Sequence, residues 1–190
     1  MRVLIAALLA LAVALSPVKA EERKSFSQAE LDQTLAPVAL YPDALLSQVL
    51  MAATYPLEIV EAARWSRANP GIQGDEAVSA VQDKDWDPSV KSLVAFPNLL
   101  ARMDENLEWT RRLGDAFLAQ EAQVMDTIQQ LRQRAKAEGK LESDERQRVT
   151  ADGQTIVIEQ ANPSVVYVPY YDPYVVYGSW WWPAYPPAYW

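Results

Sequence analysis

Apolar residues recur at three- and four-residue intervals over most of the chain, and this spacing predicts a mainly α fold. Residues 26–69 contain three helical segments. The first follows Ser27, which is expected to form a capping box with Glu30, and Pro37 ends it. The second, at residues 42–53, has so few polar side chains that it belongs in an interior. The sequence therefore predicts a helical core around these segments.

Four further helices are predicted before Gly139, which ends the last of them. Asp75 is expected to cap the first of the four. Asp87 is expected to cap the second, where Pro88 takes a position that needs no N–H donor. Gly114 marks a break or bend before the longest helix. The predicted helices after the second one span residues 57–67, 75–82, 88–94, 98–112 and 115–138.

Near the C-terminus the period of the pattern changes from helical to two. Residues 148–151 and 154–158 predict the strands of a hairpin, joined by the two-residue turn Asp152-Gly153. Two related strings follow at residues 162–167 and 172–177, each with a proline at its entrance. They predict further strands, so we expect a small antiparallel β-meander of three or four strands.

The last 24 residues hold 11 of the 19 aromatic residues and no lysine or arginine. This composition predicts an extended, polyproline-like tail whose rings contact a partner. Exposed Trp and Tyr suit stacking on sugars, protein association or insertion at a membrane interface. The alternative is that the tyrosines before residue 178 pack back onto the helices as strand residues. The candidate binding residues are Tyr167, Tyr170, Tyr171, Tyr174, Tyr177, Trp180, Trp181, Trp182 and Trp190.

The first 20 residues have the pattern of a secretory signal peptide. Arg2 is the basic end, residues 4–15 are apolar, and residues 18–20 resemble a cleavage site. The apolar run is shorter than the roughly 20 residues that span a bilayer, so we expect cleavage rather than a retained membrane anchor. The predicted organisation is a signal peptide (1–20), a multi-helix orthogonal domain (21–139), a linker (140–148), a β-meander (149–178) and an aromatic, proline-rich tail (179–190).

The amino-acid composition limits the ligands that the protein can bind and the reactions that it can catalyse. Without Arg2 and Lys19, 15 basic and 25 acidic residues leave a net charge of −10, which opposes binding to nucleic acid. The sequence contains no cysteine and no histidine. Their absence excludes Ser-His-Asp and Cys-His nucleophiles, thiolate or imidazole zinc sites and ordinary haem ligation. We therefore expect no cofactor, and an enzyme only if carboxylate, lysine, tyrosine or hydroxyl groups perform the reaction.

One carboxylate pair fits a catalytic pattern. Glu58 and Glu61 share a helix face with Trp65, and two carboxylates beside an aromatic ring are typical of glycoside hydrolases. The simpler interpretation is that Glu61 forms an ion pair with Arg64 on a solvated face. The alternating carboxylates at residues 83–87 open like a calcium loop, but the later positions lack the glycine and glutamate that such a loop needs.

Five unusual strings stand out, at residues 35–46, 54–58, 85–91, 109–120 and 166–169. They resemble the bacterial family catalogued as domain of unknown function 3300, over residues 26–178. The resemblance implies an exported envelope protein, sometimes membrane-associated, whose C-terminal part is often a long aromatic or glycine-rich region. It implies no particular reaction.

These observations favour an exported protein of the periplasm or cell envelope that binds rather than catalyses. The expected partner is an envelope component, namely the cell wall, a membrane interface or a protein, and self-association through the tail is a third hypothesis. The alternative function is an envelope glycan hydrolase that uses Glu58 and Glu61. A Glu58→Gln variant with unchanged wall-degrading activity would argue against that alternative.

Overall fold

The computed structural model of the protein describes residues 25–162 and 167–189. The predicted signal peptide lies outside these ranges, as do four residues of the predicted strand at 162–167. Within the described ranges the chain is mainly helical, with one small antiparallel sheet, which confirms the predicted fold class. The elements are α1 (Gln28–Leu35), α2 (Asp43–Ala52), α3 (Pro56–Ala68), α4 (Gly74–Ala80), α5 (Pro88–Leu93), α6 (Pro97–Glu105), α7 (Leu107–Ala137), β1 (Gln147–Asp152), β2 (Thr155–Gln160) and α8 (Pro173–Val176).

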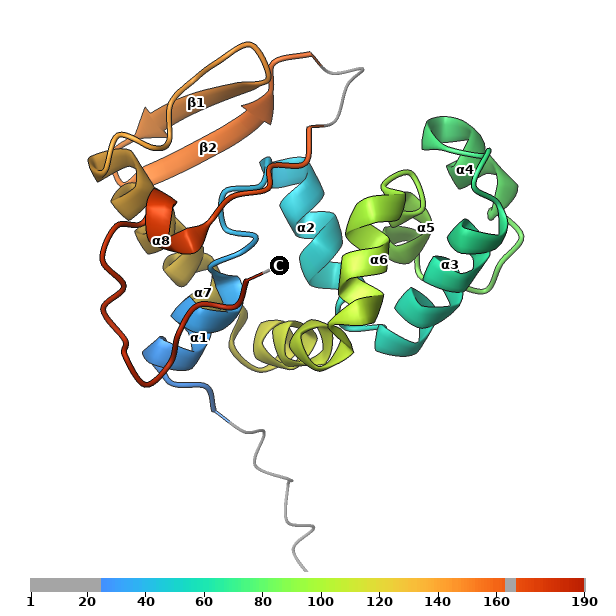
Figure 1. The fold of residues 1–190 in the computed structure, drawn as a ribbon, viewed down its shortest axis with the longest axis horizontal. Helices are drawn as coiled ribbons and strands as arrows, with labels where there is room; N and C mark the ends of the chain where they lie inside the picture. Colours follow the sequence, from blue (N-terminus) through green and yellow to red (C-terminus); the bar gives the residue numbers. More distant parts are fainter. Residues whose placement is uncertain (1–24, 163–166, 190) are drawn as a thin grey trace, which may run out of the picture.

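Helix α2 occupies the middle of the molecule. It packs against α5, against α7 and against strand β2, while α1 packs along α7 and α3 packs on α6. Figure 1 shows the β-hairpin at one end, α3 and α4 at the other, and α2 between them. The apolar faces of these elements form one contiguous core. No helix of the described residues is both long enough and apolar enough to span a membrane.

Two of the predicted helix caps are confirmed. The Ser27 hydroxyl accepts a hydrogen bond from the Glu30 N–H, and the Glu30 carboxylate accepts one from the Ser27 N–H. The Asp87 carboxylate accepts from the Ser89 N–H at 2.8 Å. The cap predicted at Asp75 is wrong. Gly74, with its φ of +58°, is the first residue of α4, so Asp75 lies in the first turn, where its charge suits the helix dipole.

The long helix α7 bends at a different place from the one predicted. The chain breaks at Asn106 and kinks at Gln120 (φ −146°, ψ 48°), whereas Gly114 lies inside the helix. The Gln120 side chain accepts from the Phe26 N–H at 2.5 Å and donates to the Phe26 carbonyl at 3.1 Å. This exchange ties the kink to the chain entering α1. The break predicted at Gly114 is therefore wrong, because that glycine permits close packing and not bending.

The hairpin is confirmed with a register one residue away from the prediction. Asp152 pairs with Thr155, so the turn consists of Gly153 and Gln154. Gly153 has a φ of +60°, which suits the first position of a tight hairpin turn. Among the described residues the sheet has two strands and not three or four.

The second string predicted as a strand, at residues 172–177, forms the short helix α8. The Asp172 carboxylate accepts from the Tyr174 N–H at 2.8 Å, and Pro173 occupies the first helical position. Asp87 and Pro88 start α5 in the same way. The Asp-Pro pair thus acts as a helix start here too, and it outweighs the strand propensity of the following tyrosine and valines.

Candidate binding site formed by the C-terminal segment

The C-terminal segment, residues 167–189, lies against the helical core and does not extend freely from it. Figure 1 shows it running from α8 past α1 and returning toward the middle of the molecule. The indole N–H groups of Trp181 and Trp182 both donate to the Asp32 carboxylate of α1, at 2.8 and 2.6 Å. Asp32 is 4% exposed and also accepts from Gln28. Within the described residues the aromatic tail is therefore docked on the helical core.

Two tyrosines of this segment satisfy the backbone of a buried turn. The side chains of the turn at residues 36–41 are almost fully buried, and several of its backbone groups bond to side chains from distant parts of the chain. The hydroxyls of Tyr171 and Tyr177 both donate to the Ala36 carbonyl, at 2.9 and 2.8 Å. The Tyr171 hydroxyl also accepts from the Leu40 N–H. An unpaired buried carbonyl is costly, so these two phenols are part of the fold.

The remaining contacts of the segment are aromatic. The rings of Trp180 and Trp181 lie 4.3 Å apart, and the Arg134 guanidinium lies 3.9 Å from the Trp181 ring. Arg134 also donates to the Tyr177 carbonyl at 3.1 Å. Stacking and cation–π contacts of this kind add to the burial of the rings. Trp180, Trp181 and Trp182, like Tyr171 and Tyr177, are thus engaged within the protein.

Three other candidates, Tyr167, Tyr170 and Tyr174, lie nearer the surface. Tyr167 packs on Arg146 at 5.0 Å, and Tyr170 packs on Arg102 at 4.5 Å while staying 46% exposed. Tyr174 is 53% exposed. Trp190 lies outside the described residues. Among the described candidates, Tyr170 and Tyr174 are therefore the two most exposed.

The buried phenols predict a loss of stability at alkaline pH. Burial raises the pKa of the Tyr177 phenol well above its usual range, and burial together with the neighbouring Tyr177 raises the pKa of Tyr171. Their stabilising contribution is complete below the unfolded pKa of about 10 and is lost as pH rises above it. We expect the free energy of unfolding to fall by about 1.4 kcal/mol per pH unit for each phenol.

Urea unfolding between pH 8 and pH 11 measures this decline. The Tyr177→Phe variant should be less stable at pH 8, because it loses the bond to the Ala36 carbonyl. Its stability should then fall less steeply with pH than that of the natural chain. Parallel curves for the two proteins would contradict the role given to Tyr177.

The end of the segment closes a pocket, which we call the C-terminal pocket. The Gln33 side chain donates to the Pro186 carbonyl at 2.6 Å, and the Ala188 N–H donates to the Gln33 carbonyl at 3.0 Å. Beneath these bonds lies a hollow of about 550 Å³, a size typical of small-molecule sites. Its walls come from α1, from the end of α6, from the start of α7 and from the segment itself. They are Gln33, Thr34, Glu105, Asn106, Leu107, Glu108, Trp109, Arg112, Pro186, Pro187 and Ala188.

The pocket combines an aromatic ring with charged groups. The Trp109 indole N–H donates to the Thr34 carbonyl at 2.8 Å, which fixes the ring in the wall. The carboxylates of Glu105 and Glu108 lie on exposed residues of the same wall. Arg112 lies 3.8 Å from the Glu30 carboxylate. The pocket thus offers one apolar ring face beside hydrogen-bond acceptors and one cation.

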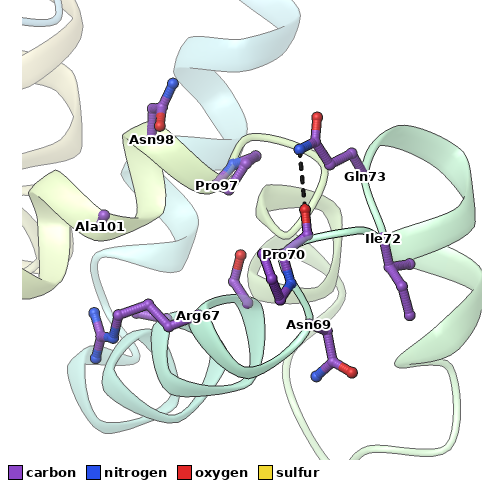
Figure 2. Close-up of a pocket in the computed structure, with 10 residues that line it drawn as sticks. Arg67, Asn69, Pro70, Ile72, Gln73, Pro97, Asn98 and Ala101 are labelled. Atoms are coloured by element: carbon purple, nitrogen blue, oxygen red, sulfur yellow. Dashed lines mark hydrogen bonds between the residues drawn. The ribbon is translucent and has the colours of Figure 1, made fainter.

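A smaller hollow lies between α3 and α6. Figure 2 shows Pro70 and Pro97 facing each other across it, with Arg67 and Asn98 on opposite sides. Its volume is about 260 Å³. Arg67 forms an ion pair with Asp104 at 2.8 Å, and the Gln73 amide donates to the Pro70 carbonyl at 3.3 Å. Since these polar side chains already have partners, this hollow is the weaker candidate.

The carboxylate pair at Glu58 and Glu61 holds a neighbouring loop. The Asp87 N–H donates to Glu58 at 2.6 Å, and the Trp86 indole N–H donates to Glu61 at 2.9 Å. Glu61 therefore has Trp86 as its partner, where helix spacing had favoured Arg64. This arrangement joins residues 54–58 to residues 85–91, two of the strings that resemble the family. It gives both carboxylates a role in joining α3 to the start of α5.

The same junction perturbs two titrating groups. Partial burial acts to raise the pKa of Asp87, but hydrogen bonds from the Ser89 hydroxyl, the Ser89 N–H and the Tyr55 hydroxyl outweigh it and hold the pKa below its usual value. The negative charge of Asp87 in turn raises the pKa of the Tyr55 phenol. Asp87 thus remains ionised and serves as a helix cap, and the described residues contain no group of three or more acidic side chains able to hold a metal ion.

Comparison with known proteins identifies the family. Residues 27–190 match the family described as "Protein of unknown function (DUF3300)". The chain belongs to this family. The DUF3300 chain is also 49% identical over 199 residues to the "Uncharacterized protein YacH" of Escherichia coli (strain K12). The alignment covers 88% of this chain and 32% of that protein, so the chain spans about a third of its relative's length. No solved structure matches the chain.

The local sequence pattern does not predict the C-terminal pocket. Trp109 lies in one of the strings that resemble the DUF3300 family, but Glu105 and Glu108 look like ordinary exposed helix residues. The partner wall comes from Pro186 and Pro187, almost eighty residues later. Nothing in the local pattern links these two parts of the chain, because the pairing depends on the Gln33 side chain.

Proposed function

We propose that this protein is a non-catalytic binding module exported to the bacterial envelope, and that it binds an envelope component in the C-terminal pocket. The observation that carries the proposal is the docking of the C-terminal segment, which builds one wall of the pocket. A ligand there would contact the helical core and the segment together. Export rests on the leader pattern of residues 1–20.

The chemistry of the pocket favours a glycan of the cell wall. The C–H faces of a sugar ring pack on an indole such as Trp109, while sugar hydroxyls donate to carboxylates such as Glu105 and Glu108. An anionic membrane surface is disfavoured, because these carboxylates and the acidic chain as a whole would repel it. The exposed Tyr170 and Tyr174 would contact a partner outside the pocket.

A hydrolase that uses Glu58 and Glu61 is a weaker proposal. Both carboxylates accept hydrogen bonds from the loop at Trp86 and Asp87. A catalytic acid or base must exchange protons with a substrate. Carboxylates that position a loop are poorly suited to that task, so we favour binding over hydrolysis.

Co-sedimentation with isolated cell-wall sacculi tests the proposal. We expect the mature chain to pellet with sacculi and not with vesicles of anionic lipid. Replacing Glu105 and Glu108 by glutamine should weaken pelleting at least about tenfold, because two charge-assisted hydrogen bonds are lost. The matched control replaces Glu142 and Glu145, which are also exposed and change the net charge equally. This control should pellet like the natural chain.

A deletion of residues 186–190 provides the second variant. It removes the segment's wall of the pocket but keeps Tyr171, Tyr177, Trp181 and Trp182, which hold the rest of the segment in place. A truncation after residue 160 would be unsuitable, since it leaves the Ala36 carbonyl without its phenols. Undiminished pelleting of the shorter deletion would contradict the pocket as the binding site, and pelleting with vesicles alone would point to a membrane partner.

A further inference from the structure

A third hollow, separate from the C-terminal pocket and from the hollow between α3 and α6, lies between α2 and α7. We call it the α2–α7 groove. It has a volume of about 390 Å³. Leu46, Leu50 and Ile128 are at most 3% exposed and form its apolar floor. Met51 and Met125 stand on its two sides and are 44% and 43% exposed. The groove is therefore an apolar trough whose sides come from two different helices.

The methionines at the edges indicate a surface for a partner. A methionine side chain is flexible and polarisable, so it adapts to apolar groups of varied shape. Two of them exposed beside a buried leucine and isoleucine floor leave an apolar patch open to solvent. Phe117 precedes the kink at Gln120 and extends this lining to the other side of the kink. The groove thus has the form of the troughs into which amphipathic helices lay their apolar faces.

The charges around the groove favour a partner of opposite charge. Asp43 and Glu121 line it, and Asp126 is an exposed neighbour of Met125. Helix α2 carries no lysine or arginine, and α7 carries none between Arg112 and Arg132. Arg132 itself is 1% exposed and forms an ion pair with Asp43 at 2.6 Å, so its charge does not face the solvent. The groove offers a partner apolar contacts and exposed acidic groups.

We propose that the α2–α7 groove binds a cationic amphipathic helix of a partner protein. Apolar side chains at intervals of three and four would enter the trough between Met51 and Met125. Lysine or arginine side chains on either side of that stripe would face the exposed residues Glu121 and Asp126, while Asp43 is already paired with Arg132. Charge complementarity of this kind accelerates association and excludes acidic partners.

The test uses the full mature chain and a fluorescent leucine–lysine peptide with an amphipathic helical pattern. We expect saturable binding that weakens as salt is added, and no binding of the same pattern made with leucine and glutamate. Replacing Met51 and Met125 by glutamine should weaken binding at least about tenfold. The control variant Leu57→Gln changes a leucine that is 77% exposed and does not line the groove, and it should bind normally.

A second pair of variants tests the groove independently, in case the variant with both methionines replaced does not fold. Replacing Glu121 and Asp126 by lysine should weaken binding, whereas the same change at Glu142 and Glu145 should have little effect. Equal binding by the groove variants and the controls would overturn the proposal. So would tight binding of the leucine–glutamate peptide, or a dimer of the chain that dissociates when Met51 and Met125 are replaced, which would make a second copy the occupant.

Discussion

Replacing Gly114 by alanine should destabilise the protein by about 3 kcal/mol, one of the largest effects expected of so small a change. Gly114 lies inside α7 where that helix meets the end of α2. A Cβ atom added there would lie 2.2 Å from the Ala53 carbonyl oxygen and 2.9 Å from the Thr54 nitrogen. Both are backbone atoms, so no side chain can move aside to relieve the clash. The two helices would have to separate.

Urea unfolding, followed by circular dichroism, measures this loss. A decrease of about 3 kcal/mol corresponds to a fall in the melting temperature of roughly 6–12 °C for a chain of this length. Gly71→Ala is the matched control, because no atom lies within 4 Å of the position of its added Cβ and its backbone has no positive φ. The control should change stability by no more than about 0.5 kcal/mol. Equal stability of the two variants would mean that the contact of α7 with Ala53 is not tight.

Local signals in the sequence predicted local structure well. The capping box at Ser27 and the cap at Asp87 depend on residues within three positions of each other, and both form as predicted. The hairpin also follows from its alternating pattern and from Gly153. Asp172 and Pro173 start a helix, although the tyrosine and valines that follow them favour β structure and predict a strand. At this position the Asp-Pro pair, which favours a helix start, outweighs the β propensity of the residues that follow it.

Local sequence signals do not predict contacts between residues that are far apart in the chain. Tyr171 and Tyr177 belong to a stretch whose composition is typical of an exposed, adhesive tail. Their role depends on the Ala36 carbonyl, about 135 residues earlier in the chain. Gly114 shows the same limit, since its sequence context indicates flexibility while its neighbours require a small residue. The three-dimensional structure shows that buried backbone groups of the turn at residues 36–41 are the groups that the side chains of Tyr171 and Tyr177 bond.

Arg132 is the strongest example of such a distant contact. Arg132 comes directly after Leu131, a residue of the apolar stripe of α7. The sequence pattern therefore predicts that the Arg132 side chain lies beside the stripe and is exposed to solvent. It is instead 1% exposed, and its guanidinium donates to three carbonyls at 2.8 to 3.0 Å. It also forms an ion pair with Asp43 at 2.6 Å. The three carbonyls belong to Ala39, Tyr41 and Ile156, so one side chain joins α7 to the buried turn and to β2.

Arg132→Met should therefore cost about 3–5 kcal/mol, because methionine fills a similar space but donates to none of the three carbonyls. The Ala39 and Tyr41 carbonyls lose the guanidinium as donor, and the Ile156 carbonyl keeps only the Gln129 amide at 3.3 Å. Lysine should not rescue the fold fully, since a single ammonium cannot reproduce the fork that reaches all four partners. Arg111→Met is the control on an exposed part of the same helix and should be nearly neutral.

Asp43→Asn separates the ion pair from the carbonyl contacts. The Asp43 side chain is 44% exposed, so solvent screens its attraction to Arg132, and we expect the variant to lose about 1 kcal/mol or less. Urea unfolding of these variants compares the free energy contributed by the ion pair with that contributed by the hydrogen bonds to the carbonyls. If Asp43→Asn cost as much as Arg132→Met, the ion pair would hold the turn in place. The expected order, with Arg132→Met far more damaging, would show that the guanidinium acts mainly as a donor to the backbone of residues 39–41 and of β2.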